Sequence, residues 1–277
     1  MPGISFEFFP PKTIEQREQL EQTVLKLKPL KPDYVSVTFG AGGSTLDYTV
    51  ESVRGLVQRH GLDTAPHLSC VGGTGAELRA LLATYRALGC RRIVALRGDL
   101  PSGMATLGEF RFARDLVEFI RGETAGHFHI EVAAYPEVHP QATDAGSDLR
   151  HFLDKVAAGA NGAITQYFFN ADAYFRFVRE VRAAGSTIPV VPGIMPIGNF
   201  SQLRRFSAVC GAEIPRWIER RMLALGDDAD AIRALGVEIL TDLCRRLLDG
   251  GAPGLHFYTL NRARATLEVA TTLGLGG

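Results

Sequence analysis

The chain alternates between short β-rich runs and longer helical patterns from one end to the other, and this alternation constrains its fold more than any other feature. Eight runs are rich in β-branched and aromatic residues and have the length of a strand. They cover residues 4–9, 34–39, 65–70, 92–98, 129–135, 163–168, 188–194 and 254–260. The segments between them carry apolar residues at three- and four-residue spacing, which is typical of amphipathic helices. These segments include 14–28, 46–60, 75–89, 108–122, 147–159 and 171–184.

Strict alternation of strands and helices predicts a parallel sheet with right-handed crossovers. Eight such units favour closure into a single (β/α)8 TIM barrel over residues 1–277, and an open doubly wound sheet is the alternative. An extra helical stretch, about 199–250, precedes the eighth strand, and its pattern leaves open whether it forms one helix or several. Glycine is common directly after helices, and four of the predicted helices are followed by one. These glycines are Gly61, Gly89, Gly159 and Gly185.

Composition argues against several classes of function. The 30 basic and 30 acidic residues give a formal net charge of +0, so no electrostatic signal favours nucleic acid or a membrane surface as a partner. No run reaches the roughly 20 apolar residues of a membrane-spanning helix, and the N-terminus has no signal-peptide pattern. The four cysteines lack metal-site spacing, which indicates reduced thiols and a cytoplasmic protein without a metal site.

The C-terminal ends of the strands are where the chemistry of a (β/α)8 barrel lies. Side chains alternate along a strand, and Phe6 and Phe8 should face the covering helices, so Glu7 should point inward near the tip of the first strand. A carboxylate among phenylalanines loses hydration, which favours its protonated form. Glu7 is therefore a candidate proton donor. The structural alternative is a glutamate paired with a basic residue inside the barrel.

Polar residues also occur at the ends of the other strands. Burying many polar groups without a function is costly, so we expect them to share an active site. They include Ser36, Thr38, His67, Ser69, Arg97, Asp99, Tyr135, Gln166, His256, Asn261 and Arg262. No Rossmann, P-loop, zincin or nucleophile-elbow motif is present. The glycine-rich segment 40–45 and the basic residues Arg97, His139 and Lys155 are weaker candidates for contacts with phosphates.

Several longer motifs resemble those of the methylenetetrahydrofolate reductases, a family of FAD-dependent folate enzymes. They occur in family order and cover nearly the whole chain. The matching segments are 5–13 (SFEFFPPKT), 37–41 (VTFGA), 66–68 (PHL), 96–101 (LRGDLP), 134–140 (AYPEVHP), 159–166, 192–196 (PGIMP) and 256–262 (HFYTLNR). The resemblance implies a bacterial-type member that has the catalytic barrel only.

The resemblance also implies a role for each matching residue. Glu7 matches the catalytic acid, and Asp99 matches the carboxylate beside the flavin and the folate. The residues that match FAD contacts are Thr38, Phe39, Ala41, His67, Arg97, Gly98, Asp99, Tyr135, His139, Ala142, Asp148, His151 and Lys155. Those that match substrate contacts are Gln166, Gln202, Phe206, His256 and Arg262. His151 and Asp154 stand where the family commonly has an asparagine and a basic residue.

The implied activity is the reduction of 5,10-methylenetetrahydrofolate to 5-methyltetrahydrofolate, which supplies methyl groups for methionine synthesis. NAD(P)H would first reduce FAD, and the folate would then be reduced after Glu7 protonates one of its nitrogens. The implied partners are these small molecules and further copies of the chain in a homo-oligomer. The choice between NADH and NADPH is open. The alternatives are a proline-dehydrogenase-like flavoenzyme, a cofactor-free lyase or aldolase that uses Lys12 or Glu7, and a non-catalytic folate-binding subunit.

Overall fold

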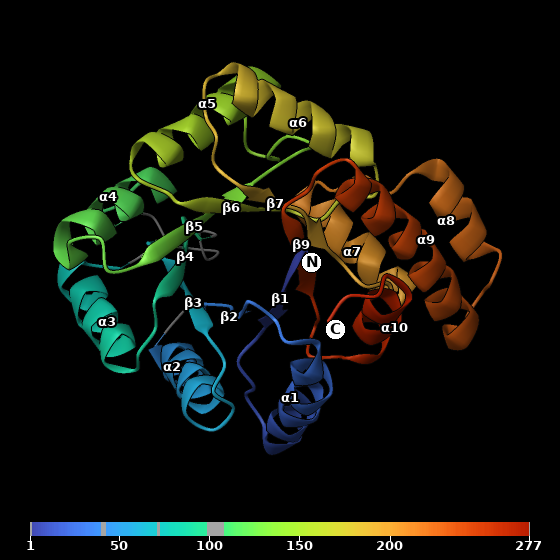
Figure 1. The fold of residues 1–277 in the computed structure, drawn as a ribbon, viewed down its shortest axis with the longest axis horizontal. Helices are drawn as coiled ribbons and strands as arrows, with labels where there is room; N and C mark the ends of the chain where they lie inside the picture. The colour runs from blue at the N-terminus through green and yellow to red at the C-terminus, as the bar shows by residue number, and fades with distance from the viewer. Residues whose placement is uncertain (1, 40–42, 71–72, 99–107, 277) are drawn as a thin grey trace.

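The computed structural model describes residues 2–39, 43–70, 73–98 and 108–276, and the strands of these residues form one parallel sheet. The strands lie in the centre of the molecule with helices around them (Figure 1). Their bounds are β1 Gly3–Phe8, β2 Tyr34–Val37, β3 Thr64–Ser69, β4 Arg92–Leu96, β5 His129–Ala134, β6 Gly162–Thr165, β7 Val190–Val191, β8 Gly193–Ile194 and β9 Gly254–Tyr258. Their order in the sheet is β7-β6-β5-β4-β3-β2-β1-β9-β8.

The predicted seventh strand, 188–194, consists of the two short pieces β7 and β8, which are separated by Pro192. Proline has no backbone N–H and cannot donate to a sheet ladder, so the expectation of one continuous strand was wrong. β7 pairs with β6, and β8 pairs with β9. The two pieces together take the place of one strand, and the predicted (β/α)8 barrel is confirmed.

Helices follow the strands as expected, with three of them in region 199–250. Their bounds are α1 Ile14–Leu27, η1 Lys28–Leu30, α2 Gly43–Gln58, α3 Gly75–Ala87, α4 Ala113–Thr124, α5 Ala145–Ala157, α6 Ala171–Ala183, α7 Phe200–Cys210, α8 Arg216–Leu223, α9 Ala229–Asp249 and α10 Arg264–Thr272. The four glycines expected after helices all have positive φ, from 63° at Gly61 to 113° at Gly159. Within the described chain, no helix has the length and apolar character to cross a membrane.

The helix α4 begins later than the sequence pattern predicts, at Ala113 instead of 108. The carboxylate of Asp115 accepts hydrogen bonds from the backbone N–H groups of Arg111 and Phe112, each at 3.0 Å. These bonds satisfy donors that precede the first helical turn, which defines the start of the helix there.

Two apolar layers hold the barrel together. The larger one lies between the strands and the helices and contains Phe6, Phe8 and Phe257, each at most 1% exposed. The smaller one fills the barrel interior, where Tyr34, Ala65, Val94 and Ile164 form a separate cluster. Phe6 and Phe8 therefore face the helices as predicted, which leaves the intervening Glu7 on the inner side of β1.

A charged cluster occupies the N-terminal end of the barrel. Glu131 is 4% exposed, and its Oε1 lies 2.6 Å from Arg92 Nη1 and 3.1 Å from His129 Nε2. The Arg92 guanidinium stacks over the Tyr34 ring at 4.4 Å. A Cβ at Gly162, on the neighbouring strand, would collide with the Glu131 carboxyl, so the absence of a side chain there leaves room for that carboxyl. This end of the barrel is closed by a buried ion pair and is far from the strand tips.

The Arg92→Met variant should lose about 3 kcal/mol of unfolding free energy, because it leaves the buried Glu131 carboxylate without its guanidinium partner. Urea denaturation at pH 7 measures the loss. Arg245→Met is the control, since it removes an exposed ion pair with Asp242, and exposed pairs contribute little. Equal losses in the two variants would contradict the importance of the buried pair.

Candidate active site

The side chain of Glu7 lies inside the barrel between two histidines, one on β3 and one on β9. Its Oε2 is 3.5 Å from His67 Nε2 on β3 and 4.0 Å from His256 Nε2 on β9. Neither of these ring nitrogens has a hydrogen-bond partner, although both are buried. The Glu7 carboxyl is therefore the nearest polar group to which both rings are directed. Its side chain keeps 19% exposure, so it is desolvated without being sealed from the barrel mouth.

The surroundings of the two histidines differ in their effect: burial keeps His67 neutral, and His256 has a hydrogen-bond partner. Burial lowers the pKa of His67 to about 4, an effect that the Glu7 carboxyl opposes and His256 reinforces. His67 is consequently uncharged at neutral pH, and its contact with Glu7 is not an ion pair. His256 has no exposed surface, and its Nδ1 lies 2.7 Å from the Ser5 hydroxyl. The resemblance implies substrate contact for His256, which stays a prediction; in the structure its polar neighbours include Ser5 and Glu7.

A cavity of about 230 Å³ lies beside the ends of β4 and β5. Six residues that match the family's FAD contacts line it, together with Phe112, Arg114 and Gln141, which sequence reasoning missed. The six are Arg97, His139, Ala142, Asp148, His151 and Lys155. The Gln141 amide oxygen accepts a hydrogen bond from Arg97 Nη2, a contact that only the folded chain reveals.

The most unusual cation in this cavity is Lys155. Its Nζ donates a 2.5 Å hydrogen bond to the Ala133 carbonyl, and within the described chain it has no ion-pair partner. Burial lowers its pKa to about 8, and Asp148 partly opposes this shift. A buried ammonium group with no carboxylate of the described residues at ion-pair distance is a suitable partner for a phosphate. The nearby His139 packs edge-on against Tyr135 at 4.4 Å.

A second cavity, of about 50 Å³, lies between α7 and the end of β9. Gln202, Phe206 and Arg262, all matched to folate contacts, line it. Phe206 is 37% exposed, which leaves its ring available to a ligand. Met195 and Asn199 also line this cavity. The sequence pointed to Met195 only as part of the matching segment 192–196.

The remaining predicted residues lie at the same mouth or outside the described chain. Thr38, Phe39 and Gln166 follow β2 and β6 and are partly exposed. Gly98 follows β4 with φ of 85°, a conformation that favours glycine. Asp99 and Ala41 fall outside the described residues, so their predicted roles are untested.

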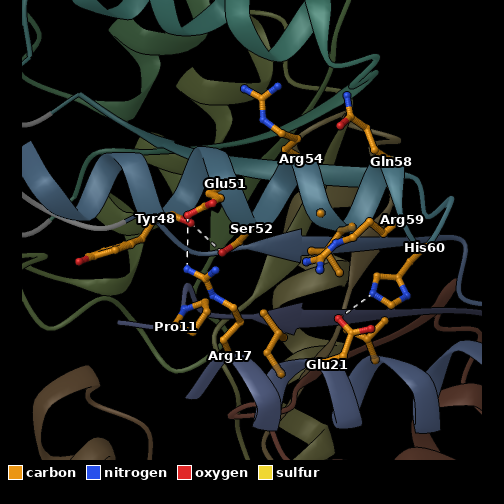
Figure 2. Close-up of a pocket in the computed structure, with 14 residues that line it drawn as sticks. Pro11, Arg17, Glu21, Tyr48, Glu51, Ser52, Arg54, Gln58, Arg59 and His60 are labelled. Atoms are coloured by element: carbon orange, nitrogen blue, oxygen red, sulfur yellow. Dashed lines mark hydrogen bonds and ion pairs between the residues drawn. The ribbon is translucent and has the colours of Figure 1, made fainter. Parts of the chain in front are cut away.

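A groove of about 220 Å³ between α1 and α2 lies on the outer surface of the barrel. Four of its charged or titratable groups form pairs: Arg17 with Glu51 at 3.5 Å and Glu21 with His60 at 3.1 Å (Figure 2). Arg54 and Gln58 point away from it in the same view. The groove lies away from the strand ends, where the predicted site residues are. No group of three metal-ligating side chains occurs within the described ranges.

The closed parallel barrel, with a carboxyl and two cavities at the C-terminal ends of its strands, defines a (β/α)8-barrel enzyme. A family model described as methylenetetrahydrofolate reductase matches residues 1–274. The chain therefore belongs to the methylenetetrahydrofolate reductase family, as its motifs indicated.

Curated relatives support this assignment along the whole chain. The 5,10-methylenetetrahydrofolate reductase of Escherichia coli (strain K12) is 42% identical over 273 residues, which cover 99% of this chain and 91% of the relative. Methylenetetrahydrofolate reductase (NADH) 1 of Arabidopsis thaliana is 36% identical and covers 99% of this chain, but the match spans 48% of the plant protein.

A solved structure with the same architecture is an uncharacterized protein from Clostridium thermocellum, described as binding two copies of 5-methyl-5,6,7,8-tetrahydrofolic acid. It is 18% identical, has a TM-score of 0.69, and the match covers 99% of this chain and 94% of that one. At this identity the likeness supports the fold alone.

The low pKa of His67 predicts a specific acid sensitivity. Between pH 6.5 and about 4 the unfolded chain binds a proton at this histidine and the folded protein does not, so stability falls as the pH falls. Wild type should lose about 3 kcal/mol more across this window than His67→Gln does. Urea denaturation at a series of pH values measures the difference. The exposed His151→Gln is the control, and a His67→Gln profile parallel to wild type would refute the prediction.

Proposed function

We propose that this chain catalyses the reduction of 5,10-methylenetetrahydrofolate to 5-methyltetrahydrofolate with FAD as cofactor and NAD(P)H as electron donor. The observation that carries the proposal is the position of the Glu7 carboxyl, which lies inside the barrel between His67 and His256 and keeps 19% exposure. The relatives named 5,10-methylenetetrahydrofolate reductase support the substrate and the reaction.

The cavity beside β4 and β5 has the chemistry that FAD requires. Arg97, His139 and Lys155 supply donors or positive charge to its walls, which Asp148 and Asp154 also line. A pyrophosphate would accept hydrogen bonds from these donors. When bound, FAD would supply the two-electron transfer between NAD(P)H and the folate.

In this proposal Glu7 donates a proton to a folate nitrogen. Its carboxyl lies between His67 and His256 inside the barrel, and the side chain keeps 19% exposure, which leaves it open to a ligand at the barrel mouth. Asp99 is proposed as the second carboxylate at the site. Gln166, Gln202 and Arg262 are proposed to bind the folate, with Phe206 stacking on its rings.

Two further parts of the proposal concern the donor and the assembly. A plant relative is named as NADH-dependent, which favours NADH over NADPH as the donor. We also propose that the chain acts as a homo-oligomer and supplies methyl groups for methionine synthesis. Sedimentation of the purified protein tests whether it forms a homo-oligomer. An assay with NADH and with NADPH tests the choice of donor.

The Glu7→Gln variant should retain FAD and its bleaching by NAD(P)H, because that half of the reaction needs no protonated carboxyl. Its folate reduction should fall by about 10²- to 10⁴-fold, the usual contribution of a general acid. Absorbance at the flavin band and a folate turnover assay measure the two halves separately. Full folate turnover by this variant would refute the role of Glu7, and a protein that binds no FAD would refute the proposed function.

FAD binding should weaken as the pH rises through about 8, where Lys155 loses its charge. Binding of a phosphate favours the charged ammonium, so the affinity is highest below this pH and falls above it. In Lys155→Met the affinity at pH 7 should be about 10-fold lower and this pH dependence should disappear. Fluorescence titration with FAD between pH 6.5 and 9.5 is the measurement. The control is Lys26→Met, on the exposed face of α1, which should behave as wild type.

A further inference from the structure

The side chain of Tyr258 crosses the barrel interior from β9 to β6, where its hydroxyl meets the Thr165 carbonyl. Tyr258 lies opposite Glu7 in the register of β1 and β9, so its side chain starts beside the candidate acid. Its hydroxyl donates a 2.6 Å hydrogen bond to the carbonyl oxygen of Thr165, the last residue of β6. Its ring packs edge-on against His256 at 5.3 Å. Tyr258 therefore links the strand pair that carries Glu7 to the strand that immediately precedes Gln166.

The peptide between Thr165 and Gln166 is held from two sides. Its carbonyl oxygen accepts the Tyr258 hydroxyl, and its N–H donates a 2.8 Å hydrogen bond to the Ala134 carbonyl on β5. The orientation of this peptide determines the direction in which the Gln166 side chain leaves the backbone. Loss of one of the two bonds would let the peptide rotate and would move Gln166 at the barrel mouth.

The interruption of the seventh strand at Pro192 explains why the Tyr258 side chain can reach the Thr165 carbonyl. Pro192 has no N–H, and the N–H of the next residue, Gly193, donates to the Thr165 hydroxyl at 2.9 Å. A Cβ at Gly193 would lie 2.5 Å from the Tyr258 ring and would also collide with the Thr165 carbonyl. Glycine at 193 thus leaves the space through which the Tyr258 ring reaches β6.

The Tyr258 hydroxyl is a donor under all physiological conditions. Burial raises its pKa well above the usual value of a phenol, and the neighbouring Glu7 carboxyl raises it further. The hydroxyl therefore keeps its proton and cannot serve as a base. These contacts point to a role in holding geometry, without proton transfer.

We propose that Tyr258 is a positioning residue for folate reduction, which acts by fixing the Thr165–Gln166 peptide and hence the Gln166 side chain relative to Glu7. The proposal rests on the proposed function of the site, because Gln166 is there assigned to folate binding.

The test compares Tyr258→Phe with Tyr174→Phe in the full-length, FAD-loaded protein. Tyr174, on α6, also donates its hydroxyl to a strand carbonyl, that of Val190 at 2.8 Å, but it lies outside the barrel mouth. Both variants lose one hydrogen bond of the same kind, so similar shifts of the melting temperature are expected. Only Tyr258→Phe should lower kcat/KM for 5,10-methylenetetrahydrofolate, by about 10-fold.

A double-mutant cycle with Gln166→Ala separates action through Gln166 from other effects of the hydroxyl. The Tyr258→Phe change should cost about 10-fold in the wild-type background and less than about twofold in Gln166→Ala. Equal costs in both backgrounds, or equal kinetics of Tyr258→Phe and Tyr174→Phe, would overturn the proposal while the function stands. Wild-type protein that fails to reduce the folate would overturn the proposed function and, with it, the role of Tyr258.

Discussion

Closure of the barrel depends on a seventh strand that is interrupted at Pro192 and still pairs with both of its neighbours. Because the strand is broken, its second piece, β8, starts with Gly193, whose lack of a side chain makes room for Tyr258. Closure also brings β9 beside β1, which places His256 within reach of Glu7. The break at Pro192 therefore affects the barrel interior, because Gly193 bonds to the Thr165 hydroxyl and leaves room for the Tyr258 ring.

The surroundings of Glu7 and the cavity beside β4 and β5 differ in the charged groups that they contain. Next to Glu7, His67 is neutral at physiological pH because it is buried, and His256 lies within hydrogen-bond distance of the Ser5 hydroxyl. The cavity beside β4 and β5 instead contains the cations Arg97, Arg114 and Lys155, together with the carboxylates of Asp148 and Asp154. A carboxyl in a weakly charged interior suits proton donation, and a cationic cavity suits a phosphate-bearing cofactor. The two tasks of the proposed reaction thus require different environments, and the barrel separates them.

The sequence predicted the architecture well because parallel β/α units have strong local signals. The alternation on β1 placed Glu7 inward, and the structure confirms this arrangement through its contacts with two histidines. The expectation of a continuous strand over 188–194 failed, because an apolar run does not report how a proline divides its hydrogen bonds. The complete burial of His256 could not be read from its motif, since a motif does not encode depth.

The sequence by itself determined the fold class, the family and the inward face of each strand, because periodicity and motifs are properties of neighbouring residues. Tertiary structure alone decided which of these inward residues meet. Glu7, His67, Thr165 and Tyr258 come from four strands, and only barrel closure brings their atoms within a few ångströms. Burial likewise decided the charge of His67 and Lys155, because the pKa of a side chain depends on the solvent that the fold removes from it.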